Sequence, residues 1–164
     1  MKRILILTTG GTFNKVYDPI RGELLVDPTI KTVETIVSRW RADYRTMACI
    51  GKDSLDMTDA DRHELLSVVS QARTQDIVIV HGTDTLEQSA TLIAEAQLEK
   101  RIVFTGAMIP WSIDPVEATA NLAMAVGALH WIDTDGVYIA MNGVVDHHTR
   151  VKKDRKKGRF IRAD

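Results

Sequence analysis

Hydroxyl and charged side chains directly follow short apolar runs in this 164-residue sequence. The run ILIL leads into TTGGT, which places Thr12 behind two glycines, and the run DIVIV leads into HGTDT, which places Thr83 beside Asp84. A threonine hydroxyl is a poor nucleophile unless a base removes its proton. A lysine held neutral by burial is such a base, and Lys152 or Lys153 could supply it, oriented by the neighbouring carboxylate. These residue types predict nucleophilic attack on a carbonyl carbon.

The two glycines before Thr12 allow two interpretations. In the structural one, a buried strand ends and Gly10 and Gly11 make the turn that follows it. In the chemical one, the missing Cβ atoms let the backbone approach a ligand closely, and exposed N–H groups there hold an oxyanion. The convergence of several such segments, described below, favours a site.

Phosphate and metal chemistry fit the sequence less well. TTGGTF lacks the spacing and the lysine of a phosphate-binding loop, and no G-x-G-x-x-G follows an apolar run. His147 and His148 stand beside Asp146 without a further His or Cys nearby, so a polar loop is favoured over a metal site. His81 is expected to brace its loop by hydrogen bonding rather than to titrate. We expect no metal and no organic cofactor.

The elements that must position these residues follow an alternating pattern. Five apolar, β-branched runs predict strands at 3–8, 44–50, 76–81, 101–106 and 136–141. Their near-continuous apolarity is typical of parallel strands buried on both faces. Polar, glycine-bearing segments follow them at 8–13, 51–58, 81–85, 106–114 and 142–153. Because ligands bind outside the carboxyl ends of strands in open α/β sheets, these segments should meet at one site.

Four helical patterns fill the gaps between the predicted strands. They are expected to open at Asp27–Pro28, after Thr58, at about Leu86 (running to Leu98) and near Pro115. The alternation predicts a three-layer α/β/α domain with a mainly parallel sheet, Rossmann- or flavodoxin-like. We place this domain at residues 1–149 and interpret residues 150–164 as a basic C-terminal tail.

Composition bounds the remaining possibilities. With 45% hydrophobic and 26% charged residues, the sequence is typical of an ordinary globular domain, and its net charge of -1 predicts no overall attraction to nucleic acid or to a membrane. Residues 150–164 carry eight Lys and Arg against two Asp, which we interpret as a solvated, partly mobile end. The single cysteine, Cys49, is expected in the core. Because there is only one cysteine, an intrachain disulfide is excluded, and we predict a cytoplasmic location.

Taken together, these segments resemble the bacterial-type L-asparaginase family, which hydrolyses asparagine and sometimes glutamine. TGGT (9–12) and HGTDT (81–85) are similar to the two signature motifs of that family. GAM.P (106–110) and MN (141–142) match it in the expected order. The resemblance covers nearly the whole chain, but only the larger N-terminal domain of the family.

The resemblance implies catalytic roles for five residues. Thr12 matches the nucleophile, and Thr83 matches the second catalytic threonine. Asp84 matches the acid that pairs with the family lysine and also holds the α-ammonium group of the substrate. Lys153, rather than Lys152, aligns with that lysine when MN is the anchor. Tyr17 is the candidate for the tyrosine of a mobile flap at 14–25.

The resemblance also implies a set of substrate-binding residues. Ser54 matches the serine that binds the α-carboxylate group, and Gly11, Asp84 and Ala107 complete the expected set. Leu55 departs from the pattern, because the family usually has a substrate-binding glutamine there. The resemblance does not extend to the smaller C-terminal domain, which in the family helps to complete the active site of a neighbouring subunit.

The sequence thus predicts an enzyme that hydrolyses L-asparagine to L-aspartate and ammonia through a threonine nucleophile. Two alternatives stay open: an ammonia-producing component of an amidotransferase that acts on charged tRNA, and an amino-acid-binding domain with weak or no turnover. The helix near Pro115 has small and apolar residues on more than one face, which predicts a homo-oligomer, a dimer or tetramer, that buries part of it.

Overall fold

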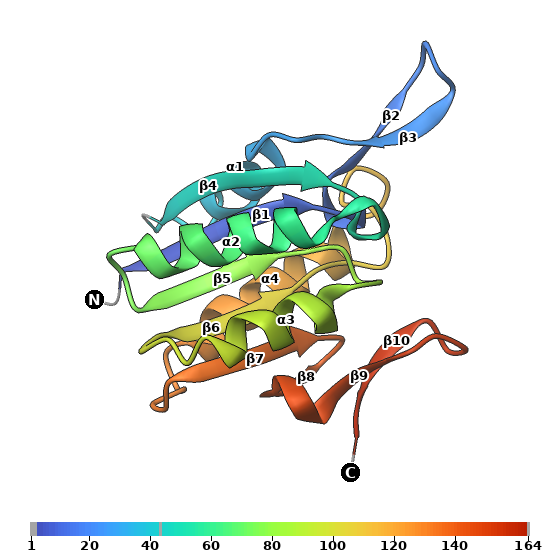
Figure 1. Ribbon diagram of the computed structural model, residues 1–164. Coiled ribbons are helices and arrows are strands. Elements are labelled where there is room, and N and C mark those ends of the chain that lie inside the picture. The colour runs from blue at the N-terminus through green and yellow to red at the C-terminus, as the bar shows by residue number, and fades with distance from the viewer. Residues whose placement is uncertain (1–2, 43, 164) are drawn as a thin grey trace.

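The computed structural model describes residues 3–42 and 44–163, and its centre is a six-stranded sheet in the order β4-β1-β5-β6-β7-β8 (Figure 1). The strands are β1 (Ile4–Gly10), β4 (Arg45–Lys52), β5 (Asp76–Val80), β6 (Arg101–Thr105), β7 (Gly136–Met141) and β8 (Val144–His147). All neighbouring pairs are parallel except β7 with β8, which is antiparallel. The predicted, mainly parallel sheet is confirmed.

Helices cover both faces of the sheet, each over its own hydrophobic core. On one face lie α1 (Lys31–Ser38) and α4 (Pro115–Ala128), packed on side chains such as Ile6 and Val78. On the other lie α2 (Asp59–Gln71) and α3 (Leu86–Glu95), packed on Leu7 and Ile79 (Figure 1). The predicted three-layer α/β/α architecture is therefore confirmed. In the flavodoxin-like strand order that results, the direction of winding reverses between β1 and β5.

Two helices begin where their capping residues predict. Thr58 and Asp61 form a capping box at the start of α2, and Asp114 caps α4 with Pro115 at the first position. The other two helices differ from the prediction at one end. The predicted opening at Asp27–Pro28 is wrong, and α3 ends at Glu95 rather than at Leu98.

The later start of α1 has a local cause. Asp27 Oδ1 accepts a hydrogen bond from the Thr29 N–H group at 2.8 Å, so the aspartate closes a turn instead of capping the helix. Thr29 Oγ1 then accepts from the N–H group of Lys31, the first residue of α1, at 3.3 Å. Pro28 packs in this turn against Gly51, where a Cβ atom would lie 2.6 Å from the proline Cβ atom.

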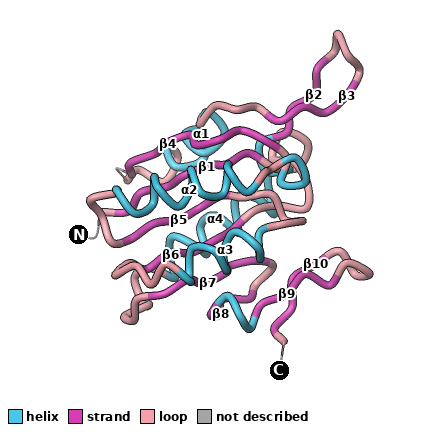
Figure 2. The backbone as a smooth tube through the Cα atoms, in the orientation of Figure 1, coloured by secondary structure: helices cyan, strands magenta, loops and turns pink. Residues whose placement is uncertain are grey.

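Two hairpins outside the six-stranded sheet and three short 3₁₀ turns complete the described chain. The hairpins are β2 (Lys15–Asp18) with β3 (Glu23–Val26), and β9 (Val151–Asp154) with β10 (Arg159–Arg162). The turns are η1 (Thr12–Asn14), η2 (Ser54–Asp56) and η3 (His148–Arg150). Figure 2 shows that both hairpins stand off the end of the sheet at which the parallel strands finish.

The interpretation of residues 150–164 as a mobile tail is wrong for residues 151–162. They form the β9–β10 hairpin, and Val151 and Phe160 are buried in the core beneath α2 and α3. The two apolar side chains anchor a segment whose other residues are mostly charged. A domain boundary at residue 149 stays a prediction.

Cys49 lies in the core, as expected. Its side chain is buried, and burial raises the pKa of the thiol to about 11, with a smaller contribution from the negative charge of Glu64. The thiol therefore stays protonated at neutral pH, which makes it a packing residue rather than a nucleophile.

Candidate active site

The loops that follow β1, β4 and β5 interlock where the sheet changes its direction of winding. A Cβ atom on Gly11 would lie 2.4 Å from the Cα atom of Gly82, and one on Gly82 would lie 2.6 Å from the Cβ atom of Ser54. Gly11 also has a φ of 75°, which other residues rarely adopt. Glycine at these positions lets the loops pack backbone to backbone. Thr12 and Thr83, the next residues in the chain, therefore lie in adjoining loops.

The N–H groups of Gly10 and Gly11 are used inside the fold. That of Gly11 donates to the Lys52 carbonyl at 2.9 Å, and that of Gly10 donates to Thr8 Oγ1 at 3.3 Å. The expectation that these two groups are free to hold an oxyanion is wrong. The expected role of Gly11 in substrate binding thus has no support from its N–H group, whereas its role in loop packing is direct.

Three other N–H groups, on the loops that follow β1, β5 and β6, have no such use inside the described fold. Thr12 begins η1, where an N–H group has no partner within the helix. Within residues 3–42 and 44–163, the N–H groups of Thr83 and Ala107 form no hydrogen bond either. Ala107 itself is buried, on the loop that follows β6. Donors of this kind could stabilise an oxyanion.

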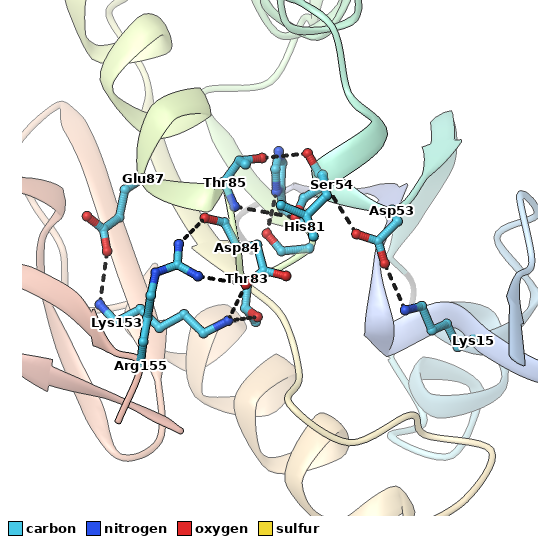
Figure 3. A network of polar contacts seen from close by, with 12 residues as sticks. Lys15, Asp53, Ser54, His81, Thr83, Asp84, Thr85, Glu87, Lys153 and Arg155 are labelled. Carbon is cyan, nitrogen blue, oxygen red and sulfur yellow. Dashed lines mark hydrogen bonds and ion pairs between the residues drawn. The ribbon is translucent and has the colours of Figure 1, made fainter. Parts of the chain in front are cut away.

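Three of the predicted site residues form one hydrogen-bonded group (Figure 3). Lys153 Nζ donates to Thr83 Oγ1 at 2.9 Å and to Asp84 Oδ1 at 2.8 Å. The lysine side chain is only 9% exposed, and it reaches from β9 to the loop after β5. The hydrogen bond from Lys153 lowers the pKa of Asp84, opposed in part by burial and reinforced by Arg155. The carboxylate therefore stays ionised, and it orients the lysine toward the threonine.

Two further residues of this group were not predicted. Arg155 NH1 lies 3.0 Å from Asp84 Oδ1, and its NH2 donates to the Asp84 carbonyl at 2.9 Å. Glu87 Oε1 accepts from the backbone N–H group of Lys153 at 2.9 Å. Arg155 lies in the turn that follows β9, so strand periodicity gives no signal for it, and the interpretation of this segment as a tail gave no reason to place it near Asp84.

Ser54 ties two loops together. Its side chain is 1% exposed, Ser54 Oγ accepts from the Thr85 N–H group at 3.3 Å, and its carbonyl accepts from Thr85 Oγ1 at 2.9 Å. Behind them, the buried Arg62 donates from NH2 to Thr85 Oγ1 at 3.0 Å. Leu55, in contrast, is 70% exposed. The structure places Ser54 beside the predicted site, and its role toward a substrate carboxylate stays a prediction.

Tyr17 is not brought to the hydrogen-bonded group. It lies on β2, its side chain is 63% exposed, and its hydroxyl forms no hydrogen bond within the described ranges. The base of this hairpin is anchored, since Lys15 Nζ pairs with Asp53 at 2.8 Å and the Lys15 carbonyl accepts from Ser112 Oγ at 2.6 Å. The predicted flap is therefore a hairpin, and the role of Tyr17 within it stays a prediction.

His81 braces the loop after β5, as expected. Its Nδ1 lies 2.8 Å from the Gly82 carbonyl, which can only accept, so Nδ1 carries the proton. Its Nε2 lies 2.8 Å from Ser89 Oγ and accepts from that hydroxyl. Complete burial lowers the pKa of His81 to about 4, and the charge of Arg62 acts in the same direction. The imidazole is thus neutral at physiological pH.

Comparison with known proteins points to one family. The family model described as asparaginase, N-terminal, matches residues 3–159. The chain is 32% identical over 158 residues to a probable periplasmic L-asparaginase of Haemophilus influenzae, across 88% of this chain and 44% of that protein. It is 29% identical over 161 residues to a glutamyl-tRNA(Gln) amidotransferase component of Thermofilum pendens, across 90% of this chain and 35% of that protein. The fold matches the thermostable L-asparaginase from Thermococcus kodakarensis with a TM-score of 0.81 at 25% identity, across 98% of this chain and 51% of that one.

The expected location is not decided by these relatives. The relative from Haemophilus influenzae is named as periplasmic, so a cytoplasmic location stays a prediction. Among the helices of the described part of the chain, none combines the length and the apolar composition that a membrane crossing requires.

The family model spans the interlocked loops at the switch point as well as β9, which carries Lys153. The chain covers less than half the length of the curated relatives, so the match concerns one domain of those proteins. It is also the domain in which the sequence motifs and the Thr83–Asp84–Lys153 group occur. The chain therefore belongs to the asparaginase family, and residues 3–159 correspond to the N-terminal domain of that family.

Proposed function

We propose that this chain is an amidohydrolase that converts L-asparagine to L-aspartate and ammonia, with Thr12 as the nucleophile. The observation that carries the proposal is the group in which Lys153 Nζ lies 2.9 Å from Thr83 Oγ1 and 2.8 Å from Asp84 Oδ1. This group adjoins the loop of Thr12, whose hydroxyl makes no hydrogen bond with the described residues. The names of the relatives support asparagine as the substrate.

The proposed reaction has two steps. Thr12 Oγ attacks the amide carbon while its proton passes to a base, and the C–N bond breaks as the departing nitrogen takes up a proton to leave as ammonia. Water then attacks the resulting ester and gives a proton to the Thr83–Lys153–Asp84 group; as the ester C–O bond breaks and aspartate leaves, this proton returns to Thr12 Oγ. Free N–H groups of the surrounding loops stabilise the oxyanion in both steps.

One alternative, an ammonia-producing component of an amidotransferase, has a specific observation in its support. The chain is similar to a component of a glutamyl-tRNA(Gln) amidotransferase, and the β9–β10 hairpin is rich in lysine and arginine. In that alternative the same group would release ammonia for use at a second active site. Such a component is expected to release ammonia slowly when alone and faster when its partner protein and charged tRNA are added.

The experiment is an ammonia-release assay on the purified chain with asparagine and glutamine. Steady release from asparagine by the isolated chain supports the proposed function. Release that requires charged tRNA and a partner supports the amidotransferase alternative. Binding of asparagine without release under either condition contradicts both and supports the third interpretation, a binding domain.

A further inference from the structure

Arg155 engages the carboxylate that also binds the proposed catalytic lysine. Asp84 Oδ1 accepts from Arg155 NH1 at 3.0 Å and from Lys153 Nζ at 2.8 Å, while Arg155 NH2 donates to the Asp84 carbonyl at 2.9 Å. Figure 3 shows both cations reaching Asp84 from the β9–β10 hairpin. A single carboxylate therefore serves two positive charges.

The neighbouring carboxylates are also engaged. Asp53 pairs with Lys15 Nζ at 2.8 Å, and Glu87 accepts from the Lys153 N–H group at 2.9 Å. Each carboxylate labelled in Figure 3 thus already has a cation or an N–H group bound to it. An ammonium group that enters beside Asp84 must displace a cation or sit close to one, and like charges at a partly buried site repel more strongly than they do in water.

Of the two cations on Asp84, Arg155 is the more accessible. Its side chain is 64% exposed, against 9% for that of Lys153. A guanidinium group in this position attracts a carboxylate of the substrate and repels an ammonium group. Its removal would leave Lys153 on Asp84 Oδ1 and would take away one of the two positive charges beside the carboxylate.

We propose that Arg155 is a specificity-determining residue that disfavours an α-ammonium group on the substrate. Compared with a protein that lacks this arginine, the wild type then discriminates less against ω-amides of short dicarboxylic acids without this group, such as succinamate, while asparagine stays a substrate. The inference rests on the proposed function, because it concerns the substrate of the same site.

The test compares kcat/KM for succinamate and for asparagine in four proteins: the wild type, Arg155→Met, Arg155→Lys and Lys157→Met. Arg155→Met is expected to shift the ratio toward asparagine by about tenfold, since one repulsive charge next to the ammonium group is lost. Arg155→Lys keeps the charge and should keep a ratio near that of the wild type. Lys157, exposed in the same turn, is the matched control and should change nothing. An unchanged ratio in Arg155→Met, with both amides hydrolysed, would overturn the proposal.

A wild type that releases no ammonia from either amide contradicts the proposed function rather than the role of Arg155. Titration calorimetry with succinate and L-aspartate then decides the second question. A ratio of succinate affinity to L-aspartate affinity that is higher in the wild type than in Arg155→Met supports the specificity role. An equal ratio in the two proteins, or no binding of either acid, overturns it.

Discussion

Lys153 and its neighbour Lys152 differ sharply in their surroundings, although they are adjacent in the chain. Lys153 is nearly buried and bonds to Thr83 and Asp84, whereas Lys152 is exposed. Lys153→Met should lower kcat for ammonia release by about 10²–10⁴-fold, the loss typical when a group that takes part in proton transfer is removed. Lys152→Met is the matched control and should retain nearly full activity. The reverse result would show that the alignment with the family lysine is off by one residue.

The sequence was sufficient to group Thr83, Asp84 and Lys153, because the motifs around them keep their order in the family. It was not sufficient for Gly11, whose N–H group was expected to face a ligand and instead bonds to Lys52. That bond depends on how closely the loops pack, and the motif carries no information on this distance. The same holds for Arg155, whose contact with Asp84 depends on the turn between β9 and β10.

At the scale of elements, the β7–β8 hairpin was not predicted, although the sequence contains a clear signal for it. Asn142 and Gly143 have φ values of 52° and 84°, as in the tight Asn-Gly turn that joins antiparallel strands, here β7 and β8. The dipeptide could have predicted this hairpin, whereas the segment 142–153 was interpreted as a loop. The β9–β10 hairpin has a weaker signal, since only Val151 and Phe160 are buried and the core they enter belongs to distant elements.

The bracing of the loop after β5 by His81 predicts a pH dependence of stability. The pKa of His81 is about 4 in the folded protein, against about 6.5 when unfolded, so the unfolded state binds more protons between these values. The contribution of His81 to the free energy of unfolding therefore has its full value above about pH 6.5, and it is lost as the pH falls toward 4. This histidine alone should lower the free energy of unfolding by about 2 kcal/mol between pH 7 and pH 5. Urea unfolding at the two pH values measures the difference.

The matched variants are His81→Gln and His63→Gln. The first should remove most of the loss between pH 7 and pH 5, whereas the second changes an exposed histidine of α2 and should preserve it. Half-buried His148, whose pKa is lowered by burial and by His147, adds a slope of the same sign. An equal loss of stability in the wild type and in His81→Gln would show that the imidazole does not carry the effect.

At the scale of the whole molecule, α4 and its ends present apolar side chains to solvent. Ala118, Leu122, Ala125 and Val126 face the core, while Val116 is 72% exposed, Ile113 is 61% exposed and Trp131 is 89% exposed. An apolar surface of this kind favours association with a second copy. We predict that the chain sediments as a dimer or larger homo-oligomer at micromolar concentration, with this surface buried.

Two substitutions that introduce a glutamate distinguish a specific interface from a general effect of surface charge. Val116→Glu should shift the sedimentation coefficient to that of a monomer, because it places a carboxylate in the predicted contact. Ile20→Glu is the control: Ile20 is 94% exposed at the tip of the β2–β3 hairpin, and its replacement should leave association unchanged. A wild-type chain that sediments as an 18.3 kDa monomer with full amidase activity would contradict the prediction.

The central claim is that Thr12 attacks the amide, and ammonia release from asparagine by Thr12→Ala tests it most directly. The hydroxyl makes no contact on which folding depends, so the variant should unfold at the same temperature as the wild type. We predict that kcat falls by roughly 10⁴-fold or more, and that Thr12→Ala/Thr83→Ala is little worse than either single variant, because residues that act as a unit are not additive. Near-normal ammonia release by a folded Thr12→Ala protein would contradict the account.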